Sequence, residues 1–126
     1  MRDEKFRVWV KLEKKYLYPL GFVKNIFEES IIRLYVVHEN GSVLGIPYKS
    51  DEIIFEWFTG LRDKNGKEIY EGDIVTYLNR IAVIEYCDAA YELIDALGNR
   101  FISHLWNIED DSFEIIGNKF ENPELL

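Results

Sequence analysis

A cysteine and a histidine are the first candidates for chemistry in this sequence. Cys87 as a nucleophile and His104 as its base would need direct hydrogen-bond contact and a third, orienting group. The sequence pattern indicates neither, and a single cysteine is more often a small hydrophobic residue of the core. The other histidine, His38, stands beside an Asn-Gly turn and is expected to face solvent. We therefore expect no catalytic residues and treat the chain as a non-enzyme.

Carboxylates offer a second kind of chemistry, because oxygen ligands bind calcium and magnesium. Glu109-Asp110-Asp111 is an acidic run, but neighbouring carboxylates on a turn diverge, so a solvated loop is the better interpretation. Asp63 and Asn65 resemble part of a calcium loop, yet the distal bidentate glutamate of such a loop is missing. The glycines between residues 60 and 72 are too widely spaced for a phosphate-binding loop. We expect no metal site and no cofactor.

The composition indicates one folded domain. The chain has 126 residues, of which 48% are hydrophobic and 15% aromatic, enough for a core without staples. One cysteine excludes an internal disulfide and suits a reducing compartment. No apolar run approaches the roughly 20 residues of a membrane span, and the first residues do not form a signal peptide. We expect a cytoplasmic protein without membrane attachment.

Charge is distributed unevenly along the chain. Residues 1–24 carry seven Lys or Arg against three Asp or Glu, whereas residues 81–126 carry two against ten. The net charge of −8 opposes binding to phosphate backbones unless the positive charges gather on one face. The basic N-terminal strand is such a face, so nucleic-acid binding stays open as an alternative. The tryptophans and tyrosines are expected mainly in the core, where they provide large buried areas.

Strand patterns recur along most of the chain and are separated by turn residues. Residues 87–97 fit either a helix or a strand, and we favour a strand because a turn at 88–90 would continue the meander. Many short strands at this spacing predict a mainly β fold with little helix, either a small barrel or two packed sheets. Pro47 ends its strand or marks it as an edge. The expected strands are Lys5–Leu12, Tyr16–Tyr18, Ile31–Val37, Ser42–Ile46, Ile53–Phe58, Ile74–Leu78, Ile81–Tyr86, Arg100–Trp106 and Ser112–Ile116.

Two turns lie at the centre of the sequence. Asn65 and Gly66 form the tip of a polar turn, because this pair tolerates the positive φ angles of tight turns. Gly72 and Asp73 form a second turn before a β-branched strand. We expect a positive φ at Gly72 and a backbone hydrogen bond to the Asp73 carboxylate. These four residues are assigned a structural role.

The turns belong to a longer pattern. Phe58-Thr59-Gly60-Leu61, the segments Asp63–Lys67 and Ile69–Val75, and an ending of Ile115–Asn118 followed by Phe120–Leu126 resemble the signature of the YopX family, as does the opening Lys5–Trp9. The resemblance implies a phage or prophage setting and a mainly β fold, an SH3-like or related small barrel with additional strands. It implies no known activity. We expect one domain over 1–126, with an N-terminal β subregion 1–57 and a barrel-like region 58–126.

The interpretation that fits these features best is a protein-binding or self-assembling domain. We expect the partner surface to include Arg7, Trp9 and Lys11 from the first strand and Leu125 and Leu126 from the tail. Oligomers are expected because unpaired sheet edges need cover. An enzyme without a recognisable motif is the weakest alternative.

The C-terminal tail is expected to be ordered rather than frayed. A solvated tail would have no use for Phe120, Leu125 and Leu126, and Pro123 prevents continuation of the last strand. We expect Phe120 in the core and one of the two terminal leucines docked on the protein surface or on a neighbouring subunit.

Overall fold

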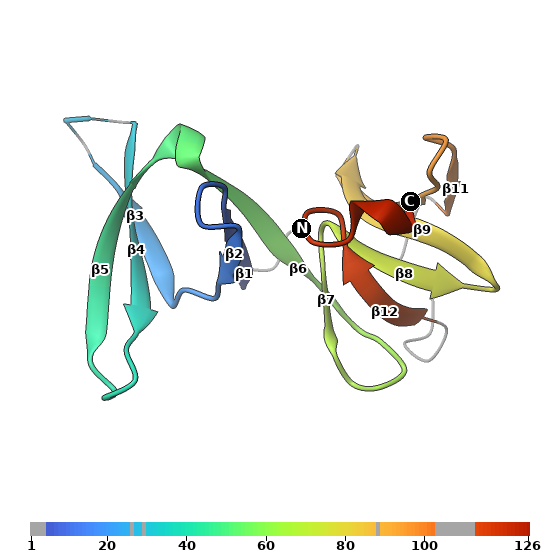
Figure 1. Ribbon diagram of the computed structural model, residues 1–126, viewed down its shortest axis with the longest axis horizontal. Coiled ribbons are helices and arrows are strands. Elements are labelled where there is room, and N and C mark those ends of the chain that lie inside the picture. The colour runs from blue at the N-terminus through green and yellow to red at the C-terminus, as the bar shows by residue number, and fades with distance from the viewer. Residues whose placement is uncertain (1–4, 26, 29, 88, 103–112) are drawn as a thin grey trace. The chain divides into compact units, whose positions relative to one another are not determined.

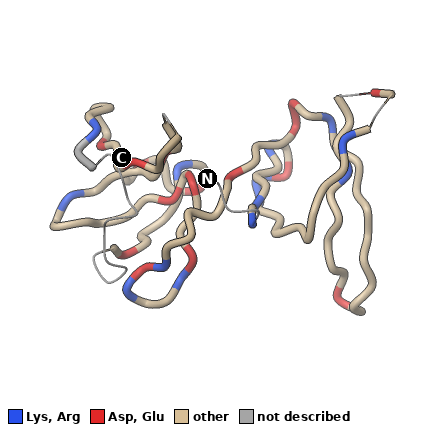
Figure 2. The backbone as a smooth tube through the Cα atoms, turned by 180° about the vertical axis from the view of Figure 1, so that it is seen from behind, with Lys and Arg blue, Asp and Glu red and all other residues tan. Residues whose placement is uncertain are grey.

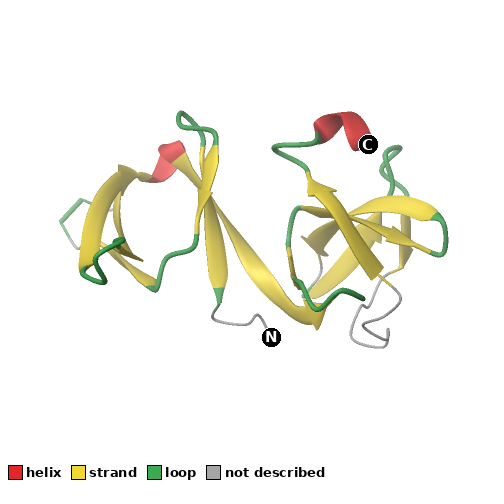
Figure 3. Cartoon of the chain, turned by 60° about the horizontal axis from the view of Figure 1, so that its bottom comes forward, coloured by secondary structure: helices red, strands yellow, loops and turns green. Residues whose placement is uncertain are grey.

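The computed structural model describes residues 5–25, 27–28, 30–87, 89–102 and 113–126, without the side chains of 101 and 102. These residues form two compact units. One unit comprises Phe6–Glu56, and the other comprises Trp57–Leu126 with the N-terminal residues up to Lys5. Strands dominate both units (Figure 3). The prediction of a mainly β fold is confirmed, whereas the predicted subdivision at residue 57 stays a prediction.

The Phe6–Glu56 unit contains five strands and the start of a sixth (Figure 1). A single 3-10 turn, η1, precedes the sixth strand, which continues into the other unit. The elements are β1 (Phe6–Val10), β2 (Lys15–Leu17), β3 (Gly21–Lys24), β4 (Ile31–Val37), β5 (Val43–Lys49), η1 (Ser50–Glu52) and β6 (Ile53–Arg62).

Strands β3, β4 and β5 form an antiparallel sheet with β4 in the centre. β4 has the bounds that the sequence predicted, and the Asn-Gly turn at residues 40–41 connects it to β5. Ile32 and Leu34 face the core, while Arg33 between them is exposed. Pro47 lies within β5, which is an edge strand, so the prediction of an edge position is confirmed. One face of this sheet thus contributes Ile32 and Leu34 to the core, and Arg33 lies on the other face.

β1 differs from its prediction, because the strand ends at Val10 and is buried on both faces. Leu12, expected on the core face, is 87% exposed in the turn that follows. Arg7 and Trp9, expected on the outer face, are buried instead. Tyr16 on the neighbouring β2 covers this side: its ring lies 5.0 Å from that of Trp9 and 4.2 Å from the Arg7 guanidinium.

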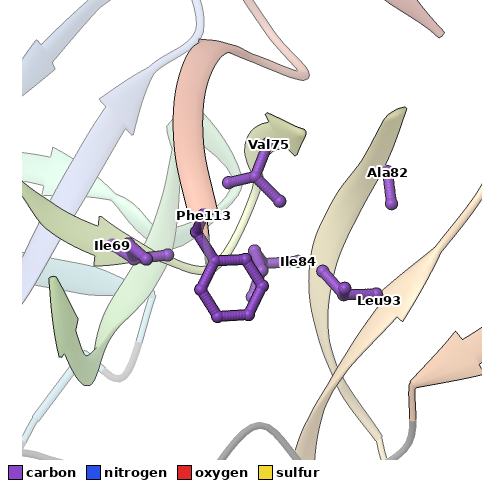
Figure 4. Close-up of a cluster of buried hydrophobic side chains, with 6 residues drawn as sticks. All are labelled: Ile69, Val75, Ala82, Ile84, Leu93 and Phe113. Carbon is purple, nitrogen blue, oxygen red and sulfur yellow. The ribbon is translucent and has the colours of Figure 1, made fainter. Parts of the chain in front are cut away.

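The Trp57–Leu126 unit contains the rest of β6 and a five-stranded antiparallel sheet in the order β11-β10-β9-β8-β12. Its core gathers Ile69, Val75, Ala82, Ile84, Leu93 and Phe113, with the Phe113 ring in the middle (Figure 4). These side chains come from five strands, so their burial holds the sheet and β7 together. The elements are β7 (Glu68–Tyr70), β8 (Asp73–Tyr77), β9 (Arg80–Cys87), β10 (Ala90–Ile94), β11 (Arg100–Ile102), β12 (Phe113–Asn118) and η4 (Pro123–Leu125).

The ambiguous segment is a strand, as favoured from the sequence. β10 pairs with β9 from Ala90 opposite Cys87 to Ile94 opposite Val83, which continues the meander. The strand predicted over 100–106 is described only as β11, and the acidic run at 109–111 lies outside the described residues. No helix in the described part of the chain is long and apolar enough to cross a membrane.

One turn type joins three of the hairpins. In each five-residue turn, the amide of the first residue donates to the carbonyl of the fifth, and the amide of the fourth donates to the carbonyl of the first. The fourth residue is a glycine with φ between +81° and +86°. Two of these turns begin with aspartate, and its carboxylate accepts hydrogen bonds from the amides two and four residues later. The left-handed φ explains the glycine at each fourth position. The three turns are His38–Ser42, Asp63–Lys67 and Asp95–Asn99.

Candidate functional site

The residues of the central signature stabilise the fold through hydrogen bonds. Gly72 has φ of +83°, and the Asp73 carboxylate accepts a hydrogen bond from the Tyr70 amide at 2.8 Å, as the sequence predicted. The Gly72 amide donates to the Ile84 carbonyl at 2.8 Å, and its carbonyl accepts from the Lys119 amide at 2.9 Å. This turn therefore connects β9 to the C-terminal segment.

Asp63 connects the other half of the signature to the same segment. Its carboxylate accepts from the Asn65 and Lys67 amides within the turn and from the Ile115 amide of β12 at 3.1 Å. Burial raises the pKa of Asp63, but the three amide hydrogen bonds outweigh it and hold the pKa below its ordinary value. The Lys64 amide also donates to the Phe113 carbonyl at 2.9 Å. The outer edge of β12 is thereby covered by the β6–β7 hairpin.

The C-terminal tail is ordered by its own asparagines. Asn118 accepts hydrogen bonds from the Phe120 and Glu121 amides, and Asn122 accepts one from the Asn118 amide at 3.1 Å. A Cβ atom on Gly117 would lie 2.6 Å from Asn122 Oδ1, so the close approach of the tail requires glycine there. The two ends of the signature thus meet in space, and we assign them a structural role.

Two predictions for the tail have different outcomes. The chain leaves the last strand before Pro123, as expected, and ends in the short 3-10 segment η4. Phe120 is half-buried and lies outside the core, so its predicted core position is wrong. The Asn118 turn directs it toward the Lys119 ammonium, which lies 5.3 Å from the ring centre. Leu125 is half-buried and Leu126 is 39% exposed.

The predicted partner surface on β1 is also corrected. Arg7 donates to the Glu56 carboxylate at 2.9 Å, and both side chains are buried, so this arginine serves a buried ion pair. Trp9 is packed beside it and cannot contact a partner from this position. Lys11 is exposed, as expected. The reason for the difference is that alternation along β1 indicates two faces but not which of them β2 covers.

The candidate site is instead the free face of the β3–β4–β5 sheet, here called the outer sheet face. The register places its side chains in rows across the three strands. Three valines on it, Val23, Val37 and Val43, are each more than half exposed. No acidic side chain of these strands lies on it, and Figure 2 shows the three strands largely free of acidic residues. The outer sheet face consists of Val23, Ile31, Arg33, Tyr35, Val37, Val43, Pro47 and Lys49.

A shallow cavity of about 150 Å³ lies on this face, lined by Val23, Asn25, Ile31, Arg33 and Tyr35. Its wall combines apolar side chains, an aromatic ring and a guanidinium. Asn25 uses its carbonyl oxygen to accept from the amides of residues 27 and 28, and its NH₂ group is a donor. Donors surrounded by apolar groups suit an anionic group carried on an apolar chain.

Tyr35 lies between two glycines on the outer sheet face, and only one of them is needed for its position. Gly21 and Gly45 are its neighbours on β3 and β5. A Cβ atom on Gly45 would lie 3.0 Å from Tyr35 Cε1, whereas one on Gly21 would meet open space. The ring therefore occupies space beside Gly45 that a side chain at this position of β5 would need.

The unit that carries the outer sheet face differs in net charge from the other unit. The Phe6–Glu56 unit contains seven Lys or Arg and seven Asp or Glu, and is neutral. Residues 57–126 contain six and fourteen, so this unit carries the net charge of −8. Among the described residues, twelve large hydrophobic residues are exposed, and eight of them belong to the neutral unit. A sequence signal for the outer sheet face is the single charged residue, Arg33, in the otherwise apolar and aromatic run 31–37.

The remaining chemical candidates are not brought together in the part of the chain that the structure describes. Cys87 is half-buried at the end of β9, and His104 lies outside the described residues. Among the residues that the structure describes, no three His, Cys, Asp or Glu side chains gather as metal ligands. The buried Glu92 forms an ion pair with Arg100.

The fold and site together define a mainly β protein with a neutral unit that exposes one sheet face and an acidic unit closed by its own tail. The YopX protein family model matches residues 5–126, so the chain belongs to the YopX family. Its recognition from the sequence is confirmed. A comparison with curated proteins gives no match.

Two solved structures are similar over nearly the whole chain. Protein EF1440 from Enterococcus faecalis is 28% identical, with a TM-score of 0.62 over 97% of this chain and 96% of that one. Protein YopX from Bacillus subtilis is 20% identical, with a TM-score of 0.64 over 97% of both chains. The second likeness shows the fold alone, and neither name states an activity.

Proposed function

We propose that the chain is a non-enzymatic accessory protein of a phage or prophage that acts in the bacterial cytoplasm by binding another protein. The outer sheet face is the binding surface, and its partner is a protein segment that carries carboxylates among apolar residues. The observation that carries this proposal is the combination of half-exposed valines, Tyr35 and Arg33 on a face without acidic side chains.

The chemistry of the face selects this partner. Arg33 and Lys49 attract carboxylates, and an arginine hydrogen bond to a carboxylate is stronger than one to a neutral oxygen. The valines and Tyr35 gain from burial at about 25 cal/mol per Å² of apolar surface. Tyrosine and arginine are also the residues on which interface binding energy concentrates.

A peptide titration tests the proposal. The probe is a synthetic peptide that alternates Glu with Leu and Tyr, and its control is the same peptide with Lys in place of Glu. We expect the acidic peptide alone to bind, and Arg33→Glu to weaken that binding at least about tenfold, since the substitution reverses a charge on the face. Lys24→Glu is the matched control. It makes the same charge change on β3, but Lys24 lies on the opposite face of the sheet from Arg33. Equal loss in both variants, or preference for the lysine peptide, would reject the proposal.

A second candidate function is binding of single-stranded nucleic acid, since Tyr35 offers a stacking ring beside Arg33 and Lys49 on the same face. This replaces the basic N-terminal strand of the sequence hypothesis, because Arg7 is buried. Titration with single- and double-stranded DNA and RNA at two salt concentrations decides between the candidates. Salt-sensitive micromolar binding would favour nucleic acid, and its absence would leave the protein partner.

A further inference from the structure

The free edge of β5 is a second surface at which another chain could add. In the described residues β5 pairs with β4 on one side only. Hydrogen bonds from His38 to Ser42 and from Ser50 to Ser30 close the two ends of this pairing. In an antiparallel pair the backbone groups of alternate residues point away from the partner strand. On β5 these outward positions are 43, 45, 47 and 49.

At three of the four outward positions, one of the two backbone groups is missing or already hydrogen-bonded. The Lys49 amide donates to the Glu52 carboxylate at 2.7 Å. Pro47 has no amide hydrogen to offer. The Gly45 carbonyl accepts a hydrogen bond from Arg33 Nη1 at 3.2 Å. An added strand would therefore find no amide at two positions and an occupied carbonyl at a third.

Gly45 is the residue that permits this arrangement. A Cβ atom at this position would lie 3.0 Å from Arg33 Cδ and 3.3 Å from its Cγ. The arginine stem thus crosses β5 at a place where another residue would have a side chain. Gly45 does not have a left-handed φ, so the close approach, not the backbone conformation, requires glycine.

We propose that Arg33, Gly45, Pro47 and Glu52 close the β5 edge against strand addition by a second copy of this chain. Open edges are templates for pairing, and prolines and charged side chains are the usual means of blocking them. The outer edge of β5 is consequently not a site at which a second copy adds a strand. This inference concerns the edge alone and holds whichever partner binds the face.

Two different openings of the edge test the proposal. Gly45→Ala displaces the arginine stem while keeping its charge, and Arg33→Ala with Pro47→Val removes the guanidinium and restores an amide. Gly21→Ala is the matched control, because it lies on the other side of Tyr35 and its new Cβ meets nothing within 4 Å. Light scattering measures the mass of each full-length protein over a tenfold range of concentration.

We expect both openings to raise the mass about twofold or more with concentration, relative to the wild type, as a second copy adds. Gly21→Ala should keep the wild-type mass. Amide hydrogen exchange at Val43 and Gly45 should slow at least several-fold in the associated variants, which locates the new contact at β5. If Gly45→Ala fails to fold by circular dichroism, the double variant decides. A double variant that is folded and keeps the wild-type mass at every concentration would overturn the proposal.

Discussion

At the scale of single residues, aspartates and glycines perform most of the structural work. Asp63 joins a hairpin turn to β12 through a single carboxylate, and Asp95 occupies the same position in a second turn. Asp95 accepts from the Asn99 and Leu97 amides, which lower its pKa, but it has no third amide from another strand among its described contacts. The two turns form an internal comparison within one chain.

Replacing Asp63 by Asn should destabilise the protein by about 1–3 kcal/mol at neutral pH, because hydrogen bonds to a charged acceptor are lost. Asp95→Asn should cost less, because its contact with another strand is an ion pair with the exposed Arg80 of β9 at 3.6 Å and not an amide hydrogen bond. Because the folded-state pKa of Asp63 is depressed, its contribution is present above the unfolded-state pKa and disappears as the pH falls through the folded-state pKa. Chemical denaturation from neutral to acid pH measures this. A constant difference between wild type and Asp63→Asn across that range would contradict the assignment.

Gly72→Val should destabilise the protein by about 1–3 kcal/mol, because valine is strained at φ of +83°. The thermal midpoint measures the effect, and an unchanged midpoint would reject it. Asn65→Ala is the control at an exposed turn and should have a modest effect. Substituting Gly66 should cost more stability than its exposed position suggests, because a residue with a Cβ atom is strained at its φ of +81°.

These residue-level results show what a sequence can predict. A glycine followed by aspartate before a strand predicts a turn, because only local backbone geometry is involved. The third hydrogen-bond donor to the Asp63 carboxylate is the amide of Ile115, 52 residues away, and no local pattern specifies this contact. The predictions for Arg7 and Trp9 were wrong for the same reason. The alternation along β1 carries no information about β2, the strand that covers them.

At the scale of elements, two of the described sheet edges, those of β12 and β5, are covered in different ways. The turn of the β6–β7 hairpin covers the outer edge of β12, whereas side chains close β5. Edge cover was the reason to expect oligomers, and cover from within the chain removes that reason at these two edges. Oligomerisation itself stays a prediction. Strand positions were predictable because hydrophobic alternation is local, but the order of strands in the sheets was not.

The tail is the element whose docking is most directly testable. Gly117→Ala should lower stability by about 1–3 kcal/mol, because its Cβ would lie 2.6 Å from Asn122 Oδ1. Gly21→Ala, with an open environment, is the control. Deleting Glu121–Leu126 should also lower the thermal midpoint, since Asn122 then no longer accepts from Asn118. A truncated protein that melts with the full-length chain would show that the tail does not contribute.

At the scale of the whole molecule, the two units divide their properties. The net charge belongs to residues 57–126, and most exposed hydrophobic residues belong to Phe6–Glu56. The sequence signature of the family is concentrated in the acidic unit, where it closes the fold. The outer sheet face lies in Tyr16–Glu56, for which no motif was matched, so family resemblance could not indicate it.

The most direct test of the central claim is a map of binding on the ¹⁵N-labelled protein. Amide chemical shifts are followed during titration with the acidic peptide, the lysine peptide and an oligothymidine. The account predicts that the acidic peptide shifts the amides of Val23, Arg33 and Tyr35, and that the other two probes leave them unchanged. Shifts produced by oligothymidine on this face, or acidic-peptide shifts confined to residues 57–126, would contradict it.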